Sequence, residues 1–170
     1  MTDQHFALFE TRIGLCGIAW GLRGINGVQL PMGGEEKIRT RIRQRHGDIS
    51  EAAPTGHVKQ AIDRIIGLLD GEPDDLSDIP LDLDGVPEFN RSVYEIARTI
   101  PPGKTVTYGE IAKRLGGVEL SRDVGQALGH NPCPIVVPCH RVLHTGGGLG
   151  GYTGGLERKR LLLGVEGVSS

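Results

Sequence analysis

The residues best suited to chemistry are a cysteine, a histidine and a proline that follow one another in the chain. Cys139 stands between Pro138 and His140, directly after the apolar run at 135–137. A thiol attacks as its thiolate, and a free cysteine has a pKa of about 8.5, so a nucleophilic cysteine needs a group that helps remove its proton. A neighbouring histidine commonly gives that help. The pattern predicts a nucleophilic Cys139 on a rigid, buried segment.

Zinc binding is an alternative for the same region, which holds several residue types that bind this metal: His130, Cys133, Cys139, His140 and His144. Five residues separate the two cysteines, among them Pro134 and an expected apolar strand, and Pro132 separates Cys133 from His130, which matches no common structural zinc pattern. A papain-like hydrolase also pairs cysteine with histidine, but its signature lies near the mature N-terminus, whereas Cys139 comes late. We therefore expect no metal site and no such hydrolase.

A glycine-rich segment follows at 145–155 and formally contains a dinucleotide-binding fingerprint, Gly146-x-Gly148-x-x-Gly151. The residues before it do not form the first strand of a βαβ unit, and the loop is too long to begin a helix at its third glycine. It also lacks the Gly-Lys-Ser/Thr of a phosphate-binding loop. We interpret it as backbone that must closely approach a flat ligand.

Size and composition indicate a globular protein of one large or two small domains. The chain has 170 residues, of which 38% are hydrophobic and only 4% aromatic, so Leu, Ile and Val must form the core. No apolar run approaches the roughly 18 residues of a membrane span, and residues 1–5 lack the features of a secretion signal. Three cysteines argue against a disulfide framework. We expect an intracellular protein, cytoplasmic or, in a eukaryote, nuclear.

The two halves of the chain differ in charge. Residues 1–90 hold 9 Lys and Arg against 15 Asp and Glu, a net charge of −6, whereas residues 91–170 hold 10 against 6, a net charge of +4. A basic C-terminal half favours contact with phosphates, although ordinary scatter of surface charge gives similar asymmetries.

Patterns in the N-terminal half predict a small antiparallel sheet and two helices. Glycine-bearing turns separate three apolar segments, which we expect to be strands at 6–9, 15–20 and 27–30. Helical spacing of apolar residues predicts helices at 35–46 and 58–69. The acidic, proline-bearing residues 72–88 are expected to form a linker with one short strand at 79–83.

The C-terminal half reads as mostly helical, with helices expected at 87–99, from Thr107 to about 115, at 120–128 and at 156–163. Thr107 and Glu110 form a capping box, which marks the start of the second of these helices. Gly116-Gly117 then separates two short helices, an arrangement typical of a helix-turn-helix unit.

Several of these features together resemble a known family. The sequence carries, in order, Tyr108, Arg122, Asn131-Pro132, Pro138-Cys139-His140-Arg141, a Gly-Tyr-Thr-Gly-Gly segment at 151–155 and Glu166-Gly167. Over residues 87–167 it resembles the DNA alkyltransferases that repair O6-alkylguanine. The resemblance implies an α+β protein. An N-terminal α/β domain with a small antiparallel sheet would span 1–84, and a mostly helical domain with a winged-helix-like helix-turn-helix would span 85–170.

The resemblance also implies a reaction, in which an alkyl group moves irreversibly from O6 of guanine to Cys139 without a cofactor. Because O6 lies at the paired edge of the base, the nucleotide must first be flipped out of the duplex. By resemblance, Glu166 orients His140, His140 draws the thiol proton through water, Asn131 holds the cysteine segment, and Tyr108 lies beside the base. Each molecule would react once.

DNA and base contacts are implied in the same way. The partner would be double-stranded DNA bound through its minor groove by a monomer, with Arg122 filling the gap left by the flipped base. The DNA-binding residues would be Arg122, Gly125, Ala127, Gly129 and Thr107. The pocket around the base would be lined by Pro134, Val142, Tyr152, Thr153 and Gly154.

Two other classes stay open at this point. A non-catalytic lesion-binding protein of the alkyltransferase-like type shares the scaffold but replaces the acceptor cysteine, whereas this chain keeps Cys139 with His140 and Glu166. A helix-turn-helix regulator would need a second domain or a methyl-sensing site, and the acidic N-terminal half shows neither.

Overall fold

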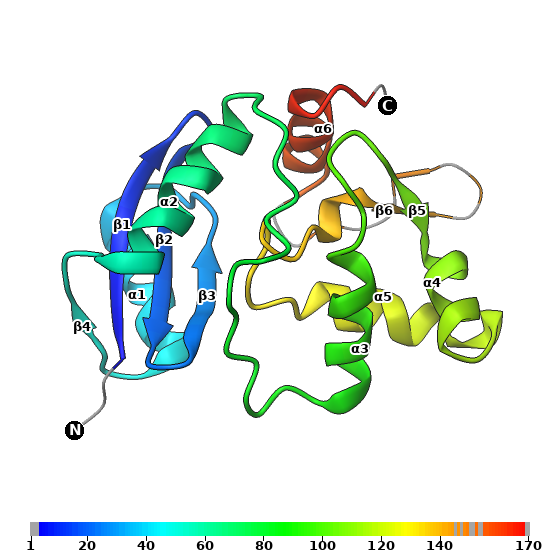
Figure 1. Ribbon diagram of the computed structural model, residues 1–170, viewed down its shortest axis with the longest axis horizontal. Coiled ribbons are helices and arrows are strands. Elements are labelled where there is room, and N and C mark those ends of the chain that lie inside the picture. The colour runs from blue at the N-terminus through cyan, green and yellow to red at the C-terminus, as the bar shows by residue number, and fades with distance from the viewer. Residues whose placement is uncertain (1–3, 145, 147, 150–151, 153–154, 169–170) are drawn as a thin grey trace.

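The computed structural model describes residues 4–144, 146, 148–149, 152 and 155–168. An N-terminal part built on a sheet lies beside a C-terminal part built mostly of helices (Figure 1). The predicted α+β class is therefore confirmed, including the small antiparallel sheet and the helical second half.

The sheet is a meander of three antiparallel strands with a short fourth strand added. β1 (His5–Thr11), β2 (Gly14–Gly21) and β3 (Gly24–Gln29) pair in sequence, and β4 (Ser50–Glu51) pairs in parallel with β1, which gives the order β3-β2-β1-β4. Gly14 and Gly24 open the second and third strands with φ of 123° and 140°. These conformations are accessible to glycine and rare for other residues, which explains the glycine at each turn.

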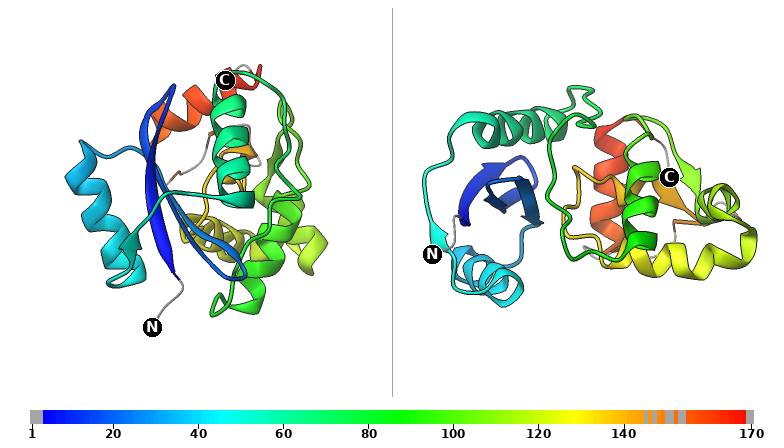
Figure 2. Two further views of the ribbon diagram at one scale, coloured as in Figure 1. Left: turned by 60° about the vertical axis from the view of Figure 1, so that its left-hand side comes forward. Right: turned by 60° about the horizontal axis from the view of Figure 1, so that its bottom comes forward.

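Two helices cover opposite faces of this sheet (Figure 2). α1 (Glu35–His46) packs Ile38 and Ile42 against Phe6 in a small separate cluster. α2 (Gly56–Leu69) contributes six buried residues to the larger core on the other face. Successive strand residues point to opposite faces, so the alternation in β1 feeds both clusters.

The prediction of a strand at 79–83 is wrong. Only Leu81 pairs with β3, through an isolated bridge to Ile25. The Ile25 N–H donates to the Pro80 carbonyl at 3.1 Å, and the Asp82 N–H donates to the Ile25 carbonyl at 2.8 Å. Pro80 has no N–H to extend this ladder, so the segment crosses the sheet edge with a single bridge.

The C-terminal part consists of helices α3 to α6 and the short elements between them. The helices are α3 (Glu88–Ala97), α4 (Tyr108–Leu115), α5 (Ser121–Gly129) and α6 (Leu156–Val165). A 3₁₀ turn, η1 (Val118–Leu120), precedes α5, and β5 (Val106–Thr107) pairs in parallel with β6 (Val142–Leu143). The capping box of Thr107 and Glu110 is present, and α4 and α5 pack against each other as the helix-turn-helix prediction requires.

Buried side chains from both parts form one continuous cluster. It joins sheet residues such as Ile18 and Val28 to Tyr94 of α3 and Val136 of the segment before the cysteine. The predicted domain boundary between residues 84 and 85 therefore stays a prediction. None of the helices in the described part of the chain has the length and apolar character needed to cross a membrane.

Candidate active site

Cys139 begins a short 3₁₀ turn, η2 (Cys139–Arg141), and the residue is only 5% exposed. The apolar run before it is not the strand that its composition suggests. Ile135 has a φ of 78°, a left-handed conformation rare for a β-branched residue, and Pro134 and Val137 form an isolated bridge around it. The Cys139 N–H donates to the Val137 carbonyl at 2.8 Å. This tight turn holds the thiol in a fixed, buried position.

Asn131 ties the cysteine to the end of α5. Its Nδ2 donates to the Sγ of Cys139 at 3.2 Å and to the carbonyl of Val137 at 2.9 Å, and its Oδ1 accepts from the N–H of Cys133 at 2.9 Å. Both ends of the amide are therefore used. A donor aimed at sulfur favours the thiolate over the thiol.

Glu166, at the end of α6, binds two neighbours of the cysteine at once. Its Oε2 lies 2.9 Å from Nε2 of His140, and its carboxylate accepts from Nε and Nη2 of Arg141 at 2.8 and 2.7 Å. Arg141 also donates to the Ile100 carbonyl at 2.7 Å. All three side chains are nearly fully buried. Such a buried, charge-assisted network is rigid because each charge depends on its partners.

These contacts determine the protonation state of His140. Burial disfavours the charged carboxylate of Glu166, but the hydrogen bonds from Arg141 and His140 outweigh it and lower its pKa to about 2. A carboxylate accepts, so Nε2 of His140 must carry the hydrogen. Burial lowers the pKa of His140, which keeps the ring neutral at pH 7 and leaves the lone pair on Nδ1, a buried atom without a hydrogen-bond partner in the described residues.

Burial raises the pKa of the Cys139 thiol, and the Asn131 hydrogen bond and the charge of Lys159 oppose that rise. Lys159 of α6 is fully buried and donates to the carbonyls of Val142, at 2.7 Å, and Leu149. Burial lowers the pKa of Lys159 to about 8. The site thus holds a neutral thiol beside a base and two groups that stabilise negative charge on sulfur.

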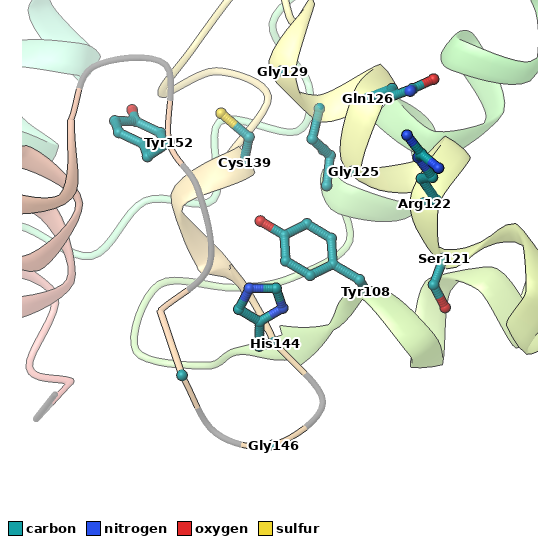
Figure 3. A pocket seen from close by; sticks show the side chains of 12 residues that line it. Tyr108, Ser121, Arg122, Gly125, Gln126, Gly129, Cys139, His144, Gly146 and Tyr152 are labelled. Atoms are coloured by element: carbon teal, nitrogen blue, oxygen red, sulfur yellow. The ribbon is translucent and has the colours of Figure 1, made fainter.

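A cavity of about 1010 Å³ opens in front of Cys139. Figure 3 shows the thiol between the rings of Tyr152 and Tyr108, with α5 forming the opposite wall. From α5 the cavity is lined by Ser121, Arg122, Gly125, Gln126, Leu128 and Gly129. Burial raises the pKa of Tyr108, so its phenol stays protonated and able to donate.

The structure brings most of the predicted site residues to this place. Cys139, Tyr108, Arg122, Gly125, Gly129 and Tyr152 line the cavity, and Asn131, His140 and Glu166 support the cysteine from behind. Pro134 lines a second cavity that also reaches Cys139. Ala127 faces inward instead, with 2% exposure, and Thr107 caps α4. Val142 is buried in β6, and Thr153 and Gly154 lie outside the described residues.

Sequence reasoning missed two buried cations. Lys159 lies in the helix predicted at 156–163 and Arg141 in the motif around Cys139, and neither was given a role. A signal for Lys159 exists, because it shares a helical face with Leu162 and Leu163, the two buried leucines three and four residues later. Within the described residues, no group of three His, Cys, Asp or Glu side chains is placed to hold a metal ion.

Comparison with known proteins gives the class to which this fold and site belong. Residues 88–168 match the family model described as 6-O-methylguanine DNA methyltransferase, DNA binding domain. In fold, the chain is similar to the crystal structure of Mycobacterium tuberculosis OGT in complex with DNA. The TM-score is 0.80 at 33% identity, covering 95% of this chain and 92% of that one.

Two relatives that match over most of their length narrow the assignment. A methylated-DNA–protein-cysteine methyltransferase of Methanothermobacter thermautotrophicus is 38% identical over 153 residues, 90% of this chain and 80% of the relative. One from Methanosarcina acetivorans is 37% identical over 167 residues, 96% of this chain and 99% of the relative. The chain therefore belongs to the methylated-DNA–protein-cysteine methyltransferase family. The expected class, a DNA-repair methyltransferase, is confirmed.

Proposed function

We propose that this protein repairs DNA by transferring the alkyl group of O6-alkylguanine to the Sγ of Cys139. The observation that carries the proposal is the buried thiol at the base of a cavity whose opposite wall is the helix-turn-helix. Family membership supports the same reaction.

Activation of the thiol follows from the fixed tautomer of His140. The lone pair on Nδ1 accepts the thiol proton, through a bridging water, while Nε2–H stays bonded to Glu166. Asn131 and Lys159 then stabilise the thiolate that forms. A base held in place by an oriented partner is the general way in which a weak nucleophile is activated.

The transfer itself is a displacement at the alkyl carbon. The sulfur–carbon bond forms as the carbon–O6 bond breaks, and the bonding electron pair stays with the guanine. The base needs one proton as it leaves, and the Tyr108 hydroxyl in the cavity wall is its donor. Tyr108 and His140 then exchange protons through solvent, so the net charge is unchanged. The thioether product is stable, so each molecule reacts once.

Docking on DNA is assigned to α5. Its cavity-facing residues Gly125 and Gly129 are small, and an added Cβ at either position meets no atom within 4 Å, so this face can approach a DNA groove closely. We assign it to the minor groove of a duplex, with Arg122 entering the stack in place of the flipped base. Each chain carries its own cysteine and cavity, which supports action as a monomer in the compartment that holds the DNA.

The first test is to mix the protein with a duplex that carries one O6-methylguanine and to weigh the intact protein and its peptides. We expect one added methyl group per chain, on the Cys139 peptide. Cys139→Ala should accept no methyl group and should still bind the duplex. Cys133→Ala is a matched control, because Cys133 is a buried free thiol in the same segment and should not be needed.

Other outcomes have distinct meanings. Methylation that persists in Cys139→Ala would contradict the assignment of the acceptor. A wild-type protein that binds the lesion and stays unmodified would instead support the non-catalytic lesion-binding class.

A further inference from the structure

Cys139 lies at the junction of two cavities. Besides the one that faces α5, a second cavity of about 700 Å³ lies on the other side of the thiol, toward the N-terminal part. Cys139 and Tyr152 are the two described residues that line both. The second cavity runs from Asn131 and Pro134 to the segment after β3 and one face of α1. An alkyl group on the sulfur therefore has space on two sides.

The geometry of displacement decides which group enters which space. In an in-line attack, the sulfur, the carbon and the leaving oxygen lie on one axis. A chain attached to that carbon must therefore project sideways from the axis. The guanine occupies the cavity toward α5 under the proposed function, so the second cavity is the space left for the chain. Its volume is many times the roughly 30 Å³ that one water occupies in the liquid.

The far wall of the second cavity is strongly cationic. Lys37, Arg41 and Arg45 are spaced four residues apart on α1, which places them on one helical face, and Arg158 of α6 joins them. The one carboxylate in the lining, Glu36, lies 3.5 Å from Arg39.

These four cations have no anionic partner within the described part of the chain. Arg39, on another face of the same helix, pairs with Glu35, Glu36 and Glu51, whereas Lys37, Arg41, Arg45 and Arg158 make no such pair. Like charges at i and i+4 destabilise a helix, so this row of cations does not contribute to the stability of α1. A row of unpaired cations that faces a cavity is suited to an anion.

We propose that the second cavity receives the chain of extended O6-alkyl groups and that its cationic wall selects chains that end in a carboxylate. This inference rests on the proposed function and names a substrate class for it. The reaction is unchanged: the sulfur bonds to the first carbon of the chain, the bond to O6 breaks with its electrons on the guanine, and the thiol proton goes to His140. The carboxylate takes no part in bond making and only binds.

The test compares three duplexes that differ at one guanine: O6-methyl, O6-(4-carboxybutyl) and the neutral carboxamide of the same length. Rate constants for transfer to the Cys139 peptide are measured by mass spectrometry at limiting protein. We expect the wild-type protein to prefer the acid over the amide by about tenfold, because the cations attract the negative charge of the carboxylate, which the amide lacks. In Lys37→Gln/Arg41→Gln, the preference should fall to about one, with the methyl rate unchanged.

Arg43→Gln is the matched control, since Arg43 is a cation of α1 that lies over the Phe6 ring and does not line the cavity. It should keep the preference for the acid. Equal rates for acid and amide in the wild-type protein would overturn the proposal. An equal fall for all three duplexes in the double variant would also overturn it, because the cations would then bind DNA phosphate. Failure of the methyl duplex itself would reject the proposed function, which is a separate result.

Discussion

At the scale of single residues, one carboxylate connects the chemistry to the fold. Glu166 fixes the tautomer of His140 and at the same time neutralises the buried guanidinium of Arg141, which holds the loop after α3 through the Ile100 carbonyl. Loss of its charge would leave a buried cation unpaired, which is among the more damaging changes in a protein interior. The carboxylate of Glu166 therefore serves both His140 in the site and Arg141 in the protein interior.

The first prediction concerns pH. Glu166 has a pKa of about 2 in the folded protein against 4.5 as its ordinary value, so its ionised form stabilises the fold by on the order of 3 kcal/mol. A lowered carboxyl pKa gives stability that is present above pH 4.5 and is lost as the pH falls toward 2. Glu166→Gln should lower the free energy of unfolding by about that amount at pH 7, and the difference from wild type should narrow between pH 5 and pH 3, as measured by urea denaturation.

Glu119→Gln is the control for this experiment, because Glu119 is exposed and makes no ion pair among the described residues. It should change the unfolding free energy little at either pH. A difference for Glu166→Gln that stays constant from pH 5 to pH 3 would contradict the assigned ionisation.

At the scale of elements, α4 and α5 contribute different residues to the cavity. The capping box of Thr107 fixes the start of α4, which places Tyr108 at the cavity, while α5 presents Arg122 and two glycines from the other wall. The two helices are joined through Gly116, whose φ of 146° permits the sharp turn between them. Under the proposed function, the start of α4 supplies the proton donor and α5 contacts the DNA.

The second prediction tests that separation. Arg122→Ala should slow transfer from a duplex by about tenfold or more, because the unstacking of the base, worth a few kcal/mol, loses its compensation. Transfer from O6-benzylguanine as the free base, which needs no flipping, should be unchanged. Arg160→Ala is the matched control, since Arg160 is exposed on α6 and lines neither cavity at Cys139. Equal slowing with both substrates would contradict the role of Arg122.

The helices could be predicted from sequence because apolar spacing and glycine or proline boundaries mark them. The helix expected at 35–46 has those ends in the structure, and α4 begins at its capping box. Apolar runs near prolines were misleading. The run at 135–137 forms a tight turn and the one at 79–83 a single bridge, because neighbouring prolines remove donors and restrict the backbone.

Some residues of the candidate site could be predicted from the sequence and others could not. Cys139, His140 and Asn131 lie close in sequence, so a motif shows them. The burial of Arg141 and Lys159 depends on partners far along the chain, such as Glu166 and the carbonyls of Val142 and Leu149. A local sequence pattern does not predict such distant partners for a charged side chain. Only the tertiary structure shows them.

At the scale of the whole molecule, the continuous core predicts cooperative unfolding. Ile18 and Val28 of the sheet share one buried cluster with Tyr94 and Val136 of the C-terminal part, and the Val28 N–H donates to the Pro132 carbonyl at 2.9 Å. Two parts with a shared core cannot separate without exposing it to water.

The third prediction follows from that shared core. Fluorescence of Trp20, the single tryptophan of the chain, reports on the sheet, and hydrogen exchange of a peptide covering α5 reports on the C-terminal part. Both probes should give the same unfolding free energy in urea to within about 1 kcal/mol. Protection of α5 lost at clearly lower urea than the Trp20 transition would show two independent domains instead.

The covering of β3 has a consequence for how the protein behaves in solution. β3 is an outer strand of its sheet, and exposed outer strands are templates on which other chains pair. Here Pro80, Asp82 and Pro132 occupy the hydrogen-bonding groups of Ile25 and Val28 along that edge. The segment at 80–82 therefore protects the edge of β3 from pairing with another copy of the chain. Any change that loosens residues 80–82 should appear first as aggregation at high protein concentration, before repair itself is lost.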